Sequence, residues 1–163
     1  MKVILVTRNR YLEYGLNQLL KKRYPVVTAR EFFMSSNRWY VPDYNESWLI
    51  INDAHFARLM RCLFQGRHFL QLDAKLLRDS EQISDAIRNG VWTYNSVARP
   101  LTMSEMVVMF GYVYRQLRPC RLAGEMGVHP KTVNTFLYTG MAKNGLQGKS
   151  VRSVALMDNS RSS

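Results

Sequence analysis

The stretch that decides the fold of this 163-residue chain reads Arg121-Leu-Ala-Gly-Glu-Met-Gly-Val-His-Pro-Lys-Thr-Val-Asn-Thr-Phe-Leu-Tyr138. It predicts a short helix, a tight turn and a second helix. Residues 126–157 contain no Asp or Glu, but they contain four cations: Lys131, Lys143, Lys149 and Arg152. A helix that lies in the DNA major groove needs such a face, because base edges offer hydrogen-bond partners whereas phosphates repel carboxylates.

The charge of the chain favours a polyanionic partner. It has 23 basic and 12 acidic residues and a net charge of +11. Residues 1–98 hold 14 basic and 9 acidic groups, whereas the shorter segment 99–163 holds 9 and 3. The excess is denser where the two-helix stretch lies, which favours nucleic acid over an anionic membrane surface. No apolar run approaches the length of a membrane span, and the apolar N-terminus is too short for a signal peptide, so a cytoplasmic protein is expected.

Strand-like and helix-like segments alternate through the first ninety residues. Short apolar runs predict strands at residues 2–6, 26–28, 48–52 and 68–72. Amphipathic or capped segments predict helices at residues 10–23, 54–64 and 80–88. This order predicts an α/β unit with a small parallel sheet. We expect a loop over residues 37–46 and a core position for Cys62. The expected division is an α/β domain at 1–92, a linker at 93–100 and an all-α domain at 101–163.

Local signals place the C-terminal helices. Thr102 and Glu105 have capping-box spacing, and Gly127 suits a left-handed turn. Pro130 favours a helix start and requires a non-helical His129. The helix that follows presents an inward stripe of Val133, Leu137 and Met141. Its outward side presents short polar groups and an aromatic ring, which are suited to phosphates and base edges: Lys131, Thr132, Asn134, Thr135 and Tyr138.

Several of these residues together form a recognisable pattern. It comprises Leu101-Thr102-x-x-Glu105, Leu122-Ala123, Gly127-Val128, Lys131-Thr132-Val133, Lys143 and Gly145. On these residues, positions 101–156 resemble the DNA-binding domain of the LuxR/NarL family of bacterial transcription regulators.

The resemblance implies a four-helix helix-turn-helix domain whose third helix enters the major groove. It implies that Lys131 and Thr132 contact phosphates and that Lys143 contacts the DNA backbone again. Asn134, Thr135 and Tyr138 would face the bases. The last helix, over residues 149–157, would be a dimerisation surface.

The chain departs from the family pattern at several positions. Phe136 stands where His is usual, and Asn144 stands where Leu is usual. Gly140 replaces an inward aliphatic residue, at a cost of about 1 kcal/mol relative to Ala in a helix interior. Arg115-Gln116 fills a turn that normally contains Gly. These changes bear on operator preference and on the rigidity of the helix.

The same family often carries a phosphoreceiver domain in front, and residues 1–92 resemble a degenerate, truncated one. Receiver chemistry needs a magnesium ion held by acids after the first strand and by an Asp after the third. Here Thr7-Arg8-Asn9-Arg10 follows the first strand. Asp53 does follow the third predicted strand, and we interpret it as a surface Asp that caps the next helix. Control by phosphorylation is therefore not expected.

Two functions of different classes remain open. No catalytic, cofactor or metal constellation is expected, because His55, His68 and His129 are dispersed. The first hypothesis is a transcription regulator of the bacterial nucleoid that binds double-stranded DNA as a homodimer or with a related regulator. The second is a protein-binding modulator that pairs with a related regulator and contacts DNA weakly or not at all.

Overall fold

The computed structural model describes residues 1–145, so the helix expected over residues 149–157 lies outside the described part. The strands are β1 (Lys2–Val6), β2 (Val26–Thr28), β3 (Ser47–Asn52) and β4 (His68–Asp73). The α-helices are α1 (Arg10–Leu20), α2 (Ala29–Phe32), α3 (Ala57–Phe64), α4 (Ser80–Asn89), α5 (Met103–Val113), α6 (Pro119–Met126) and α7 (Pro130–Lys143). Short 3-10 helices occur at η1 (Ser35–Trp39), η2 (Ala54–Phe56) and η3 (Ala74–Leu76).

The four strands form one parallel sheet in the order β2-β1-β3-β4. All four predicted strands are confirmed, and β3 and β4 are each one residue longer than expected. In the central register, Ile4 of β1 lies between Val27 of β2 and Ile50 of β3. Because β1 and β3 are buried on both faces, their runs are almost continuously apolar, as in other covered parallel sheets.

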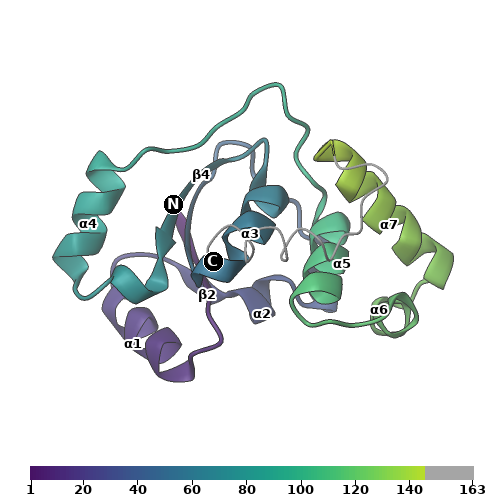
Figure 1. Ribbon diagram of the computed structural model, residues 1–163, viewed down its shortest axis with the longest axis horizontal. Coiled ribbons are helices and arrows are strands. Elements are labelled where there is room, and N and C mark those ends of the chain that lie inside the picture. The colour runs from purple at the N-terminus through teal and green to yellow at the C-terminus, as the bar shows by residue number, and fades with distance from the viewer. Residues whose placement is uncertain (146–163) are drawn as a thin grey trace.

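One face of the sheet is covered by α1 and α4 (Figure 1). Leu16 and Leu20 of α1 and Ile83 of α4 pack against alternate strand residues such as Leu5 and Leu49. Both helices have a side-chain cap, from Asn9 for α1 and from Asp79 for α4. The first helix ends at Leu20, three residues before the expected Arg23, because residues 21–23 form a turn.

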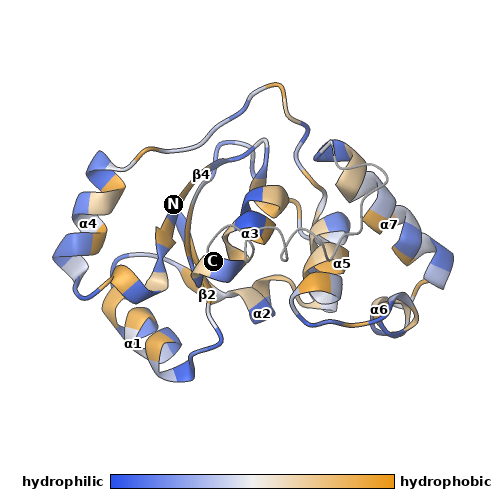
Figure 2. Ribbon diagram, viewed as in Figure 1, coloured by the Kyte–Doolittle hydropathy of each residue, from blue (hydrophilic) through white to orange (hydrophobic). Residues whose placement is uncertain are grey.

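The other face is covered by α2 and α3, and α5 packs over them. Nine of the eleven residues of α5 are buried, so this helix is apolar on nearly all sides (Figure 2). Phe110 of α5 stacks on Phe33, which follows α2, with ring centroids 4.6 Å apart. The same continuous core includes Leu122 of α6 and Leu137 of α7.

The shared core bears on the expected division into two domains. The parallel α/β sheet is present, and the buried residues of α5, α6 and α7 belong to the same hydrophobic core as residues of β1, β3, α2 and α3. The expected linker is also held in place. Thr93 makes a backbone bridge to Phe69 of β4, and the Gln65 amide donates to the Arg99 carbonyl at 2.9 Å. A helix that is apolar on nearly all sides needs cover on all of them. Here α3 and η1 cover one side of α5, and α6 and α7 cover another.

Three smaller features complete the fold. Cys62 is buried as expected, and Cys120 is exposed. The loop expected over residues 37–46 begins inside η1, so its first three residues are helical. No helix in residues 1–145 combines the length and the apolar character needed to cross a bilayer.

Candidate nucleic-acid interface

The turn between α6 and α7 has the conformation that its sequence predicts. Gly127 ends α6 in the left-handed region, with φ of 68°, and the Val128 amide donates back to the Ala123 carbonyl at 3.0 Å. His129 is extended and caps α7, because its Nδ1 accepts from the Lys131 amide at 3.1 Å. Pro130 occupies the first turn of α7 as predicted. These contacts fix the direction in which α7 leaves the turn.

One face of α7 is exposed and carries no acid. Lys131, Asn134, Thr135 and Tyr138 are exposed, and Tyr138 retains 62% of its accessible surface. Thr132 is half-buried. The Thr135 hydroxyl donates to the Lys131 carbonyl at 3.0 Å, which leaves its oxygen able to accept a hydrogen bond. Five of the six residues predicted to contact DNA therefore lie at or near one surface.

The opposite face of α7 is buried against α5 and α6. Val133, Leu137 and Met141 form the predicted inward stripe. Gly140 lies on the same side, where a Cβ atom would come within 2.6 Å of the Met109 sulfur. The glycine that departs from the family pattern therefore permits close approach of α7 to α5, which is a packing reason for its presence.

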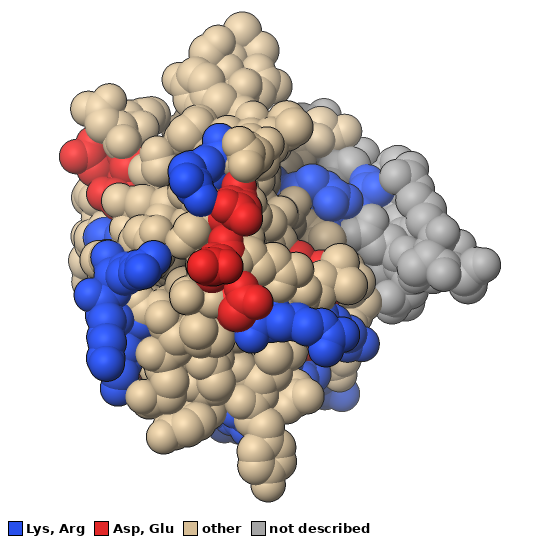
Figure 3. Space-filling model, turned by 90° about the vertical axis from the view of Figure 1, so that its left-hand side faces the viewer, with Lys and Arg blue, Asp and Glu red and all other residues tan. Residues whose placement is uncertain are grey.

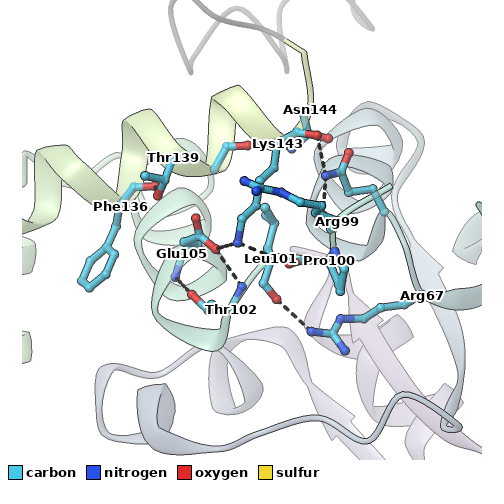
Figure 4. Close-up of polar contacts among 12 residues, drawn as sticks. Arg67, Arg99, Pro100, Leu101, Thr102, Glu105, Phe136, Thr139, Lys143 and Asn144 are labelled. Carbon is cyan, nitrogen blue, oxygen red and sulfur yellow. Dashed lines mark hydrogen bonds and ion pairs between the residues drawn. The ribbon is translucent and has the colours of Figure 1, made fainter. Parts of the chain in front are cut away.

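Lys143, the sixth predicted DNA contact, is engaged inside the molecule (Figure 4). Its Nζ lies 2.6 Å from Glu105 Oε1, and its side chain is only 15% exposed. Glu105 also completes the predicted capping box, since its carboxylate accepts from the Thr102 amide at 2.8 Å. The Lys143 carbonyl in turn accepts from the Gln65 amide at 2.8 Å. Lys143 thus joins the end of α7 to the start of α5.

The environment of Glu105 favours its charged form. Burial alone raises the pKa of this carboxyl, but hydrogen bonds from Lys143, Thr139 and the Thr102 backbone, together with the Lys143 charge, outweigh it. The net result is a pKa below the usual range of a glutamate. The ion pair is therefore formed at neutral pH and holds the two helix ends together.

Further cations lie on α6 and just before it, and sequence reasoning did not single them out. Arg115 forms a bidentate ion pair with Glu125, with N–O distances of 3.0 and 3.1 Å. Its charge is therefore neutralised within the molecule. Arg118 and Arg121 are exposed, and Arg121 lies at the outer limit of ion pairing with Glu125, at 3.9 Å. Their positions around the N-terminus of α6 were visible in the sequence as a basic cluster preceding the turn.

The opposite end of the molecule differs in charge. The face seen in Figure 3, on the side of α1 and α4, has a central band of acidic residues between separate groups of Lys and Arg. Glu81 and Asp85 on α4 are exposed there, and Asp85 pairs with Arg88 at 2.6 Å. The basic excess of the chain is therefore interrupted by acids at this end, whereas the outward face of α7 has none.

The carboxyl end of β1 carries an arginine where a receiver site requires acids. Asp53 is buried, and its Oδ2 accepts from the Arg8 amide at 3.1 Å, so the expectation of a surface Asp that caps the next helix was wrong. The Arg8 guanidinium donates to the Tyr114 carbonyl at 2.6 Å and lies 4.3 Å from the centre of its ring. Burial raises the pKa of the Tyr114 phenol, although the Arg8 charge opposes this. Arg8 therefore ties β1 to the end of α5.

Residues 1–145 contain no group of three or more His, Cys, Asp or Glu side chains that could hold a metal ion. Comparison of the chain with protein-family models, curated proteins and solved structures finds no match. The function is therefore inferred from the geometry and charge of the surfaces described above.

Proposed function

We propose that the chain is a sequence-specific DNA-binding transcription regulator that uses the outward face of α7. The observation that carries this proposal is the exposed, acid-free face of Lys131, Asn134, Thr135 and Tyr138, seated on a buried apolar stripe. A helix of 14 residues is about 21 Å long, which is enough to present several side chains to a major groove.

The proposal gives these residues different roles. The Lys131 ammonium is suited to a phosphate, and Thr132 can add a hydroxyl contact beside it. Asn134 can both donate to and accept from a base edge, and Thr135 keeps an acceptor free. Tyr138 offers an apolar ring with a polar tip. Lys143 takes a structural role in this proposal, because a phosphate contact would require breaking its pair with Glu105.

The rest of the chain is consistent with this function. The resemblance of residues 101–156 to LuxR/NarL regulators supports it, and the sheet order β2-β1-β3-β4 is that of the first four strands of a flavodoxin-like or receiver-like domain. We infer that residues 1–92 are a degenerate receiver that positions α5 rather than a phosphorylation switch. The proposed regulator acts as a dimer at the nucleoid and is not an enzyme.

Selection of duplexes from a randomised pool by the full chain tests the proposal. We expect enrichment of a shared half-site, because the exposed amide and phenol of α7 read base edges. Asn134→Ala and Tyr138→Ala are expected to change the enriched sequence, because one good base contact supplies about 1–3 kcal/mol of discrimination. Asn17→Ala in α1 is a control of the same chemistry on the other side of the sheet. Recovery of the starting pool by the wild-type chain contradicts the proposal.

A second candidate function is supported by a different surface. Tyr11 and Tyr14, one helical turn apart on α1, are largely exposed. Exposed aromatic residues are common at protein interfaces. The alternative is therefore a modulator that pairs with a related regulator and contacts DNA weakly or not at all.

A gel shift with the chain alone and with a related regulator separates the two functions. The first function predicts a shifted, sequence-specific complex with the chain alone. The second predicts a shift only when the regulator is present, and disappearance of that shift in Tyr11→Ala/Tyr14→Ala. Tight, specific binding by the chain alone excludes the second function.

A further inference from the structure

A cavity of about 300 Å³ lies where the segment after α2 meets the beginning of α5. Its walls come from three parts of the chain: residues 38–44, Arg67 after α3, and residues 100–104. We call it the α5 pocket. Its size is at the lower end of the range for small-molecule sites. It is distinct from the outward face of α7, so a ligand there would not depend on DNA binding.

The α5 pocket is lined by a buried cation, Arg67, that has no counter-charge among residues 1–145. Arg67 is only 7% exposed. One guanidinium nitrogen donates to the Leu101 carbonyl at 2.8 Å, as Figure 4 shows. The Nε atom is buried and has no hydrogen-bond partner in the part of the chain that the structure describes. Among the described residues, no carboxylate lies within ion-pairing distance of Arg67, and none lines the pocket.

Such a burial is costly for a charged group. Burial lowers the pKa of Arg67, partly offset by Tyr44 and Tyr40. An arginine nevertheless stays protonated at neutral pH. The buried charge therefore remains, and several kcal/mol of desolvation are typically offset only by an anion or by full hydrogen bonding. An anion in the pocket would supply the counter-charge that residues 1–145 do not.

The start of α5 adds a second attraction for an anion at the same place. Thr102 and Glu105 satisfy two of the amide donors in the capping box. The first-turn amides of Met103 and Ser104 have no acceptor within the helix, and the positive end of the helix dipole lies there. Both residues line the pocket. The Glu105 carboxylate does not line it, because it is held by the Thr102 amide and by Lys143.

Aromatic side chains surround the opening of the pocket. Trp39 and Tyr44 are 76% and 75% exposed, although rings of this size are usually more buried. The Arg38 guanidinium lies 4.2 Å from the centre of the Trp39 ring. Exposed flat rings beside cations are suited to stacking with another planar group.

We propose that the α5 pocket binds a small anion that carries a planar ring. The anionic group lies between Arg67 and the first turn of α5, and the ring lies against Trp39 and Tyr44. A phosphate or a carboxylate satisfies the same donors, so the proposal concerns an anionic group attached to a ring.

Calorimetric titration of the full chain with matched probes tests this proposal. Adenosine 5′-monophosphate and 4-hydroxybenzoate carry both a ring and an anion, whereas adenosine lacks the anion and inorganic phosphate lacks the ring. We expect at least one ring-bearing anion to bind about tenfold or more tightly than either partial probe. Preference for the monophosphate or for the benzoate identifies the anionic group.

Two variants locate the binding. Ser104→Asp introduces a carboxylate at a helix position where acids are stabilising, so the chain should fold while the pocket repels anions. Arg67→Gln removes the buried charge and keeps a polar group. Each is expected to weaken binding about tenfold or more. Arg88→Gln removes an exposed cation of α4, which lies across the sheet from α5 (Figure 1), and should leave binding unchanged.

Two results would overturn the proposal. One is failure of both ring-bearing anions to bind, or binding of adenosine as tight as that of its monophosphate. The other is binding that Ser104→Asp leaves at the wild-type affinity in a chain that is shown to be folded. Neither result depends on whether the outward face of α7 contacts DNA, so the two proposals fail separately.

Discussion

The two ends of α7 use the same type of residue in opposite ways. Lys131, in the first turn, is exposed, whereas Lys143, in the last turn, is half-buried and paired with Glu105. Both were predicted from the sequence to contact DNA. The difference shows that a cation is available to a binding surface only if no carboxylate of the same molecule pairs with it. The first end of α7 is available to a partner, and the second end determines where the helix lies.

The largest expected effect on stability comes from removing Lys143, the partner of the buried Glu105. Lys143→Met leaves Glu105 charged and unpaired, so we expect the free energy of unfolding to fall by about 3 kcal/mol. Urea denaturation measures the change. The double variant with Glu105→Leu should recover much of the stability, because neither charge then remains buried. If the Lys143→Met variant is as stable as wild type, the ion pair between Lys143 and Glu105 does not hold the end of α7 in place.

The pH dependence of stability tests the ion pair between Lys143 and Glu105 in a second way. The pKa of Glu105 is lower in the folded chain than in the unfolded chain, because the hydrogen bonds and charge around it outweigh its burial. Its contribution to stability is therefore present above the unfolded pKa and is lost as pH falls through the folded pKa. Glu105→Gln should flatten this acid limb of the stability curve. Glu81→Gln, which removes an exposed carboxylate from α4, should leave it as in wild type.

Close packing of α7 on α5 predicts a smaller effect at Gly140. A methyl group there meets the Met109 sulfur, so Gly140→Ala should lower the free energy of unfolding by about 1 kcal/mol despite the better helix propensity of Ala. Gly124→Ala in α6 is the matched control, since a Cβ there meets nothing within 4 Å. It should raise stability by a few tenths to about 1 kcal/mol. If thermal denaturation shows that both substitutions raise stability equally, α7 does not pack closely against α5 at Gly140.

Local sequence signals predicted the elements well because each signal acts within a few residues. The apolar runs indicated the four strands, and the Thr102–Glu105 spacing indicated the capping box. Gly127 and Pro130 indicated the turn before α7. These features depend on dihedral preferences and on hydrogen bonds between near neighbours, which a single sequence displays directly.

The features that sequence reasoning missed connect residues far apart in the chain. Arg8 binds the Tyr114 carbonyl across 106 residues, and Lys143 reaches Glu105 across 38. Hydrophobic periodicity predicts which face of a helix is buried, but it does not predict which residues of other elements pack against that face. For the same reason the sequence did not show that α5 shares one hydrophobic core with the sheet layer and with α7.

The backbone conformation at Gln116 is another feature that the sequence alone did not determine. Arg115-Gln116 stands where the family that the sequence resembles has a glycine-containing turn. The backbone still adopts the left-handed conformation, because Gln116 has φ of 56°. A non-glycine residue thus occupies a conformation that is unfavourable for it, next to Arg115, which pairs with Glu125.

The smallest expected effect on stability comes from Lys131, and the same residue gives the sharpest test of DNA binding by α7. Lys131→Gln should change the free energy of unfolding by less than about 0.5 kcal/mol. The decisive quantity is the slope of log Kobs against log salt concentration for a duplex enriched by the chain. We predict that Lys131→Gln reduces the magnitude of this slope by about 0.9, whereas Lys22→Gln, at an exposed lysine after α1, leaves it unchanged. A wild-type slope in Lys131→Gln would contradict the assignment of the outward face of α7 to DNA.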